Sequence, residues 1–280
     1  MLLIWIGAIA LLVGGLLLAL YLGQGKLVYH PRREHEATPE EFGLSVEDAW
    51  LTTDDGVKVH GWFAATENAR GAVLMCHGNG GNISHRLDMI DLWQRQGLSV
   101  LVFDYRGYGR SGGSPTEEGT YADARAAWAY LTEQKQIPPQ RIILHGRSLG
   151  GAIAAYLASR YDAGGLIVDS AFTSLPDVGA DIYPYLPVRM LVKYRYATRE
   201  YLAEANCPVL IIHSRDDDIV PFEHGEALFK AAGEPKTFVE VNGSHNDQYL
   251  MDAGKYNRAL REMVDRVFGD QPQTAQPLSP

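Results

Sequence analysis

The chain opens on one long apolar segment. Leu2 to Leu22 contains no charged residue, and as an α-helix rising about 1.5 Å per residue it would be about 31 Å long, which matches the hydrocarbon core of a bilayer. The pattern therefore predicts a transmembrane anchor over residues 1–25, followed by a polar juxtamembrane segment over 26–48. A cleaved signal peptide is disfavoured because the apolar run is too long, no basic region precedes it and no small-residue cleavage site follows it.

Basic residues follow this apolar segment, whereas only the chain terminus precedes it. Lys26, Arg32 and Arg33 lie just beyond the segment, and positive charges next to a membrane span favour the cytoplasmic side. We therefore expect a single-pass membrane protein whose larger domain faces the cytoplasm. Because the candidate chemistry lies much further along the chain, we also expect the span to contribute nothing to the core of that domain.

The rest of the chain alternates between strand-like and helix-like patterns. A hairpin pattern surrounds Asp54-Asp55-Gly56, and the short apolar runs after it alternate with amphipathic stretches. Such alternation predicts an α/β domain with a mostly parallel sheet and helices on both faces. We place this domain at residues 49–269 and a disordered tail at 270–280, which has no periodicity. The predicted strands are 71–76, 99–103, 141–145, 166–168, 209–212 and 237–241, and the predicted helices lie near 84–96, 116–134, 149–160, 222–232 and 251–268.

One connection is longer than the others. Residues 170–207 separate two predicted strands and are rich in aromatic side chains, with Phe172, Tyr183, Tyr185, Tyr194, Tyr196 and Tyr201 among them. Such a segment can form a small lid over a binding site, or it can be an ordinary helical crossover whose aromatic side chains pack on the sheet. Both interpretations fit the pattern.

Composition and charge narrow the class of protein. With 280 residues and 46% hydrophobic composition, the chain can bury one sizeable core. The net charge of −9, without a basic run, argues against nucleic acid as a partner. Cys76 and Cys207 are the only cysteines, and both border apolar runs, so we expect buried free thiols rather than a disulfide framework or a zinc site.

A predicted strand ends in the segment Gly146-Arg147-Ser148-Leu149-Gly150 and continues into a predicted helix. A serine in such a turn takes a strained backbone, and the flanking glycines let neighbouring backbone pass close by. Its hydroxyl would stand at the end of the sheet beside the positive end of the helix dipole. The pattern is that of a nucleophile elbow. The alternative, a turn serine without a chemical role, is disfavoured because a suitable acid and histidine follow in the order Ser, Asp, His.

A serine nucleophile needs a base and an acid that orients the base. His245 follows the last predicted strand, at the carboxyl end of the sheet, where ligands bind in open α/β folds. The acid is expected after the preceding strand, where three aspartates stand in a row. We favour Asp217 for its register before Pro221, and the alternatives are Asp216, Asp218 and the strand-ending Asp169.

Two backbone N–H groups are needed to bind the oxyanion. Leu149, directly after the nucleophile, supplies the first. Asn79, in the glycine-rich segment that follows an early strand, is the predicted second donor, and Gly80 is the alternative. The segment from Gly107 to Gly112 matches the G-x-G-x-x-G dinucleotide pattern, but the next helix starts only after Pro115, so we predict no nucleotide cofactor.

Together these motifs resemble a known family. His77-Gly-Asn-Gly-Gly-Asn, Asp104-Tyr-Arg-Gly-Tyr-Gly, Gly146-Arg-Ser-Leu-Gly-Gly, Asp217 before Ile-Val-Pro, and Gly243-Ser-His are similar to the membrane-anchored branch of the α/β-hydrolase superfamily, the ABHD-type serine hydrolases and their bacterial relatives. The resemblance implies an α/β-hydrolase fold, and its members include esterases, lipases, thioesterases and peptidases. Ser214 departs from the pattern, since relatives commonly carry Gly there.

We therefore predict a serine hydrolase that cleaves ester or thioester bonds of a small or lipid acyl substrate, using Ser148, Asp217 and His245 with Asn79 and Leu149 as oxyanion donors. No metal or cofactor is required by this chemistry. A serine peptidase or amidase with the same triad is the close alternative, because the acylation step is shared. A membrane-tethered scaffold without catalytic activity is the alternative from another class.

Overall fold

The computed structural model describes residues 1–269, and the predicted tail over 270–280 lies outside the described residues. Its centre is an eight-stranded sheet with the order β10-β9-β8-β7-β4-β6-β3-β2. β2 pairs antiparallel with β3, β3 pairs antiparallel with β6, and the other neighbours are parallel. The predicted hairpin and mostly parallel sheet are therefore confirmed. The strands are β2 (Glu47–Thr52), β3 (Lys58–Ala64), β4 (Gly71–Cys76), β6 (Leu98–Phe103), β7 (Ile142–Arg147), β8 (Gly165–Asp169), β9 (Val209–Ser214) and β10 (Lys236–Val241).

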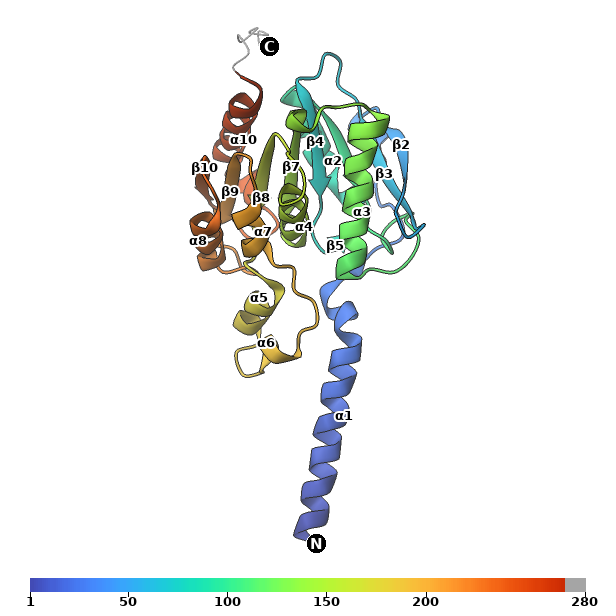
Figure 1. Ribbon diagram of the computed structural model, residues 1–280, viewed down its shortest axis with the longest axis vertical. Coiled ribbons are helices and arrows are strands. Elements are labelled where there is room, and N and C mark those ends of the chain that lie inside the picture. Colours follow the sequence, from blue (N-terminus) through green and yellow to red (C-terminus); the bar gives the residue numbers. More distant parts are fainter. Residues whose placement is uncertain (270–280) are drawn as a thin grey trace.

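Helices cover both faces of the sheet (Figure 1). Successive side chains of a strand point to opposite faces, so a central parallel strand is apolar along its whole length. In β4, Leu74 and Cys76 pack into the core shared with α3 and α4, whereas Val73 and Met75 pack into the core shared with α2 and α10. The helices of the domain are α2 (Leu87–Arg95), α3 (Glu117–Ala129), α4 (Leu149–Ala158), α7 (Thr198–Glu204), α8 (Phe222–Ala231), α9 (Gln248–Met251) and α10 (Ala253–Phe268). Cys76 and Cys207 are buried and free, as predicted.

The N-terminal segment forms one helix, α1 (Leu2–Val28), which extends away from the sheet (Figure 1). Many of its large apolar side chains are exposed, including Ile4, Trp5, Ile9 and Leu11. No helix within residues 1–269 is both long enough and apolar enough to cross a membrane. The predicted helix is thus present, but its assignment as a transmembrane anchor is not supported.

The C-terminal end of α1 joins the domain directly. The helix continues to Val28, past the predicted end of the anchor at residue 25, and Tyr29 after it is buried. β1 (His30–Pro31) then pairs in parallel with β5 (Gly80–Gly81). Near the end of α1, Gln24 is only 8% exposed. Val28 and Tyr29, past the predicted end of the anchor, therefore belong to the core of the domain, and Gln24 contacts the domain through hydrogen bonds.

The long connection after β8 has two parts. α7 packs against α4 and α8, as an ordinary crossover helix does. Before it, α5 (Leu175–Ile182) and α6 (Val188–Leu191) project from the same end of the domain as α1 (Figure 1). We refer to residues 172–193, which contain α5 and α6, as the cap.

Candidate active site

Ser148 occupies a sharp turn between β7 and α4. Its backbone has φ 53° and ψ −120°, a conformation that side-chain-bearing residues rarely adopt. The turn also requires glycine on both sides. A Cβ on Gly146 would lie 2.1 Å from the Gly150 carbonyl oxygen, and one on Gly150 would lie 1.9 Å from the Cys76 carbonyl oxygen. The backbone N–H of Ser148 donates to the Asp169 carbonyl at 2.8 Å. The geometry is that of a nucleophile elbow.

His245 and Asp217 meet at the carboxyl end of the sheet, on the loops after β10 and β9. The Asp217 carboxylate lies 2.8 and 3.0 Å from His245 Nδ1 through its two oxygens. Its Oδ1 also accepts the backbone N–H groups of Ile219 at 2.9 Å and Val220 at 2.7 Å. Burial alone would raise the pKa of Asp217, but the hydrogen bond and charge of His245 outweigh it, so the pKa lies below its ordinary value. Asp217 is thus held ionised against the imidazole.

The other candidate acids have different partners. Asp218 accepts the backbone N–H of His245 at 3.0 Å and so positions the loop rather than the ring. The Asp216 N–H donates to Ser214 Oγ at 3.1 Å. Asp169 is buried beneath the elbow, where its carboxylate accepts hydrogen bonds from Tyr256 at 2.8 Å and from Gln248. Burial would raise the pKa of Asp169, but the hydrogen bond of His145 and the charge of Arg147 lower it to about 2. Of the four aspartates, Asp217 is the one whose carboxylate faces the His245 ring.

The two predicted oxyanion donors lie at the same end of the sheet as Ser148. Leu149 is the first residue of α4, so its N–H has no acceptor within the helix. Within residues 1–269, the Asn79 N–H also makes no backbone hydrogen bond. The Asn79 side chain donates to the Val28 carbonyl at 3.0 Å, and the backbone carbonyl of Asn79 accepts a hydrogen bond from Tyr108 Oη at 2.8 Å. Both N–H groups are therefore available to a ligand oxygen.

Tyr105 and Tyr108, before and within the glycine-rich segment from Gly107 to Gly112, support the loop that carries Asn79. Tyr108 holds the Asn79 carbonyl, and Tyr105 Oη donates to the His77 carbonyl at 2.8 Å. Both tyrosines are fully buried. Sequence reasoning missed this role, although Tyr108 inside the glycine pattern and Tyr105 just before it were a visible signal.

Arg147 is a second residue whose role the sequence did not reveal. Its guanidinium donates to the His245 carbonyl at 2.5 Å through Nη2, and it lies 5.3 Å from the centre of the Tyr249 ring. Arg147 therefore connects the turn that carries Ser148 to the loop that carries His245. The position before the serine in a nucleophile elbow accepts many residue types, so the sequence could not predict this contact.

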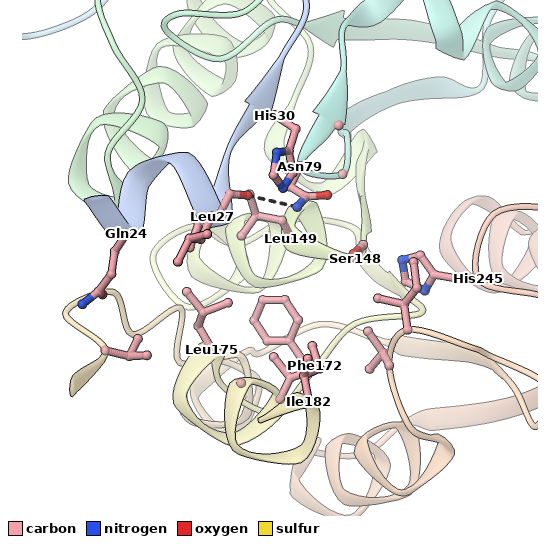
Figure 2. A pocket seen from close by; sticks show the side chains of 18 of the residues that line it. Gln24, Leu27, His30, Asn79, Ser148, Leu149, Phe172, Leu175, Ile182 and His245 are labelled. Carbon is pink, nitrogen blue, oxygen red and sulfur yellow. Dashed lines mark hydrogen bonds between the residues drawn. The ribbon is translucent and has the colours of Figure 1, made fainter. Parts of the chain in front are cut away.

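Ser148 and His245 line one large cavity, together with Asn79 and Leu149 (Figure 2). Its volume is about 1060 Å³, at the upper end of the range of about 300–1,000 Å³ for small-molecule sites. Figure 2 shows Phe172, Leu175 and Ile182 of the cap on the wall opposite Asn79. Among the described residues, Ser148 Oγ makes no hydrogen bond to the His245 ring, and such bonds often shorten only when substrate binds.

One group of side chains has the spacing of metal ligands. Candidate ligand atoms of His35, His60 and Asp104 lie within 4.8 Å of one another. However, His60 Nε2 is hydrogen-bonded to Asp48 at 2.7 Å, and Asp104 Oδ1 accepts the Ile83 N–H at 2.9 Å. None of the three cluster residues lines the cavity. We interpret the cluster as a structural network.

Comparisons with known proteins show the family and the fold of the chain. A family model described as the alpha/beta hydrolase fold matches residues 71–181. The chain is 33% identical over 270 residues to the alpha/beta hydrolase domain-containing protein WAV2 of Arabidopsis thaliana, covering 87% of this chain and 88% of that protein. It is 35% identical over 245 residues to the uncharacterized membrane protein YNL320W of Saccharomyces cerevisiae, covering 83% and 86%. Among solved structures, the esterase Pf2001 of Pyrococcus furiosus superposes with a TM-score of 0.72 at 21% identity, covering 86% of this chain and 98% of that chain, which shows a shared fold.

Proposed function

The chain belongs to the α/β-hydrolase family, and we propose that it is a serine hydrolase that cleaves ester or thioester bonds of acyl substrates through an acyl-enzyme intermediate. One observation carries the proposal. A serine in a strained strand-to-helix turn lines the same cavity as a histidine whose Nδ1 is hydrogen-bonded to a buried carboxylate. Strain of this kind is found where function requires it, and the ordered base and acid are what a serine nucleophile needs.

The proposed reaction gives each of these groups one role. Ser148 Oγ attacks the acyl carbonyl carbon while His245 Nε2 accepts the hydroxyl proton. Asp217 keeps the other ring proton on Nδ1 and stabilises the imidazolium that forms. The N–H groups of Leu149 and Asn79 bind the oxyanion of the tetrahedral intermediate. The intermediate collapses by breaking the bond to the alcohol or thiol, which leaves with the proton from His245.

Water completes the cycle. His245, now neutral, removes a proton from a water molecule as its oxygen attacks the acyl-enzyme carbonyl. The second tetrahedral intermediate releases the carboxylic acid and returns the proton to Ser148 Oγ. The apolar side chains around the cavity, such as Leu175, Val178 and Ile182, favour an acyl group over a peptide as the part of the substrate that is recognised.

A fluorophosphonate probe tests the proposal. The full-length protein should be labelled on Ser148 within minutes, because the probe mimics the attacked carbonyl and needs an activated serine. Ser148→Ala should abolish labelling, whereas Ser159→Ala, directly after the same helix α4, should leave it unchanged. Assays with matched acyl esters, thioesters and amides then rank the three bond types. A wild-type protein that neither reacts with the probe nor hydrolyses any of the three would be a scaffold, and the proposal would be wrong.

We also propose that α1 attaches the enzyme to a membrane surface. Its exposed side chains include Ile4, Trp5, Leu11 and Leu12, and large exposed apolar surfaces mark sites of membrane or protein interaction. The yeast relative is named a membrane protein, and this supports the same assignment here.

Flotation with vesicles of phosphatidylcholine and phosphatidylserine measures this attachment. The full-length protein should float with the vesicles, and the double variant Leu11→Glu, Leu12→Glu should bind at least about tenfold more weakly, because charged side chains are costly in the bilayer. Leu250→Glu replaces an equally apolar exposed residue on α9 and serves as the matched control. Wild-type protein that stays in the dense fraction would contradict the proposal.

A further inference from the structure

The cavity lies between the cap and the last turns of α1. From α1 it is lined by Leu20, Tyr21, Gln24, Leu27 and Val28. Across from them, the cap supplies a largely apolar wall that includes Phe172, Leu175, Val178, Ile182 and Leu186. In Figure 2, Leu27 and Gln24 lie on the side of the cavity opposite Phe172 and Ile182. The end of α1 therefore forms part of the binding cavity.

A single amide joins α1 to the cap. Gln24 Nε2 donates to the Leu191 carbonyl at 2.7 Å, and Gln24 Oε1 accepts the Lys193 N–H at 2.9 Å. Both polar ends of this buried side chain are thus satisfied by the backbone at the end of α6. Because an unpaired buried amide is costly, the pairing favours one fixed position of α1 against the cap.

A cluster of hydroxyl groups fixes the base of the helix. Tyr29, directly after α1, shares a 2.8 Å hydrogen bond with Tyr196 Oη, which also bonds Thr120 Oγ1 at 2.9 Å. The Tyr29 ring packs edge-on against Tyr194, with ring centres 5.5 Å apart. α1 is therefore held at two points, and it forms a fixed wall rather than a loose tether.

The two ends of the cavity differ in charge. No lining residue of α1 or the cap is charged, and the amide of Gln24 is already hydrogen-bonded. The charged lining residues Arg32, Glu36, Arg86 and Arg147, and the histidines His30, His85 and His245, lie on other segments. A substrate with a long apolar part and a polar remainder would match this division.

We propose that the space between α1 and the cap is the acyl-binding site, that it takes a single long acyl chain, and that Leu20 and Leu27 of α1 set the accepted chain length. The inference rests on the proposed hydrolase function and adds the substrate class to it. A methylene group takes up about the volume of a water molecule, about 30 Å³. A chain of about 16 carbons would therefore fill less than half of the 1060 Å³ cavity and leave room for the leaving group.

Tryptophan substitutions in the full-length protein, kept in detergent, test this assignment. Leu20→Trp and Leu27→Trp place a large ring in the proposed site, while Leu22→Trp changes the same helix at an equally apolar residue that does not line the cavity. The readout is the ratio of kcat/KM for a hexadecanoyl ester to that for an acetyl ester. Each methylene excluded from an apolar site costs about fourfold. Leu20→Trp and Leu27→Trp should therefore lower the ratio at least about tenfold, and Leu22→Trp should not change it.

Two further measurements separate the possible failures. Leu20→Ala enlarges the site and should move the preferred ester to a longer chain, which covers the case in which a tryptophan variant does not fold. Binding of the fluorescent fatty acid cis-parinaric acid to Ser148→Ala should weaken at least tenfold when Leu20→Trp is added. If the Leu20 and Leu27 variants keep the wild-type kcat/KM ratio and the wild-type affinity for cis-parinaric acid, the proposed role of α1 is wrong while the hydrolase function stands. If no ester is hydrolysed, but cis-parinaric acid still binds and Leu20→Trp weakens its binding, the hydrolase function is wrong and the proposed acyl-binding site stands.

Discussion

Ser148→Ala should lower the turnover of an acyl ester at least about 10³-fold, and His245→Ala should lower it by a similar factor. The serine substitution removes the nucleophilic oxygen, and the histidine substitution removes the group that accepts its proton. Because neither residue can act without the other, the double variant should be no slower than either single variant. Independent contributions would instead multiply to about 10⁶-fold. Steady-state kcat for a soluble short-chain ester measures all three variants.

The comparison needs a control for the fold. Ser159→Ala also removes a hydroxyl group from the region of α4, where Ser159 Oγ donates to the Tyr156 carbonyl at 2.9 Å, and it should keep wild-type turnover. Near wild-type hydrolysis by purified Ser148→Ala would move the nucleophile elsewhere. A double variant far slower than both single variants would show that Ser148 and His245 do not work on the same proton.

Much of the fold was predictable because its signals are local. Buried parallel strands such as β4, and β9 over Val209 to Ile212, are continuous apolar runs, so they stand out from the amphipathic helices between them. The elbow at Ser148 is equally local, since its glycines are required by backbone contacts within a few residues and with β4. The sequence therefore pointed to the same position as the geometry.

The acid and the wall of the cavity depend on contacts between distant residues. The Asp217–His245 pair is separated by 28 residues, and in a run of three aspartates only the tertiary structure decides which carboxylate faces the ring. For α1, apolar residues look the same whether they face lipid, water or an apolar cavity. Gln24, a lone amide at the end of the apolar run, was the available signal that this end of the helix has a polar partner.

Asp217→Asn should lower kcat about 10³- to 10⁴-fold through the tautomer of His245. In the wild type, Asp217 Oδ1 accepts two backbone N–H groups, from Ile219 and Val220, and Oδ2 faces His245 Nδ1 at 2.8 Å. An asparagine has one acceptor oxygen, and the two backbone donors would retain it. Its NH₂ group would then face Nδ1 and donate to it. The ring proton would move to Nε2, where the imidazole can no longer accept the proton of Ser148.

Neighbouring aspartates provide the matched controls for this substitution. Asp218→Asn still offers an oxygen to the His245 backbone N–H and leaves the ring tautomer alone, so we expect a loss of less than about tenfold. Asp169→Asn changes the buried network around Gln248 and Tyr256 and should act on the free energy of unfolding more than on kcat. Urea unfolding of each variant separates the two effects. A collapse of kcat in Asp169→Asn together with full activity in Asp217→Asn would assign the orienting acid to β8. The aspartate that sets the tautomer of His245 is the one whose replacement by asparagine abolishes proton transfer from Ser148.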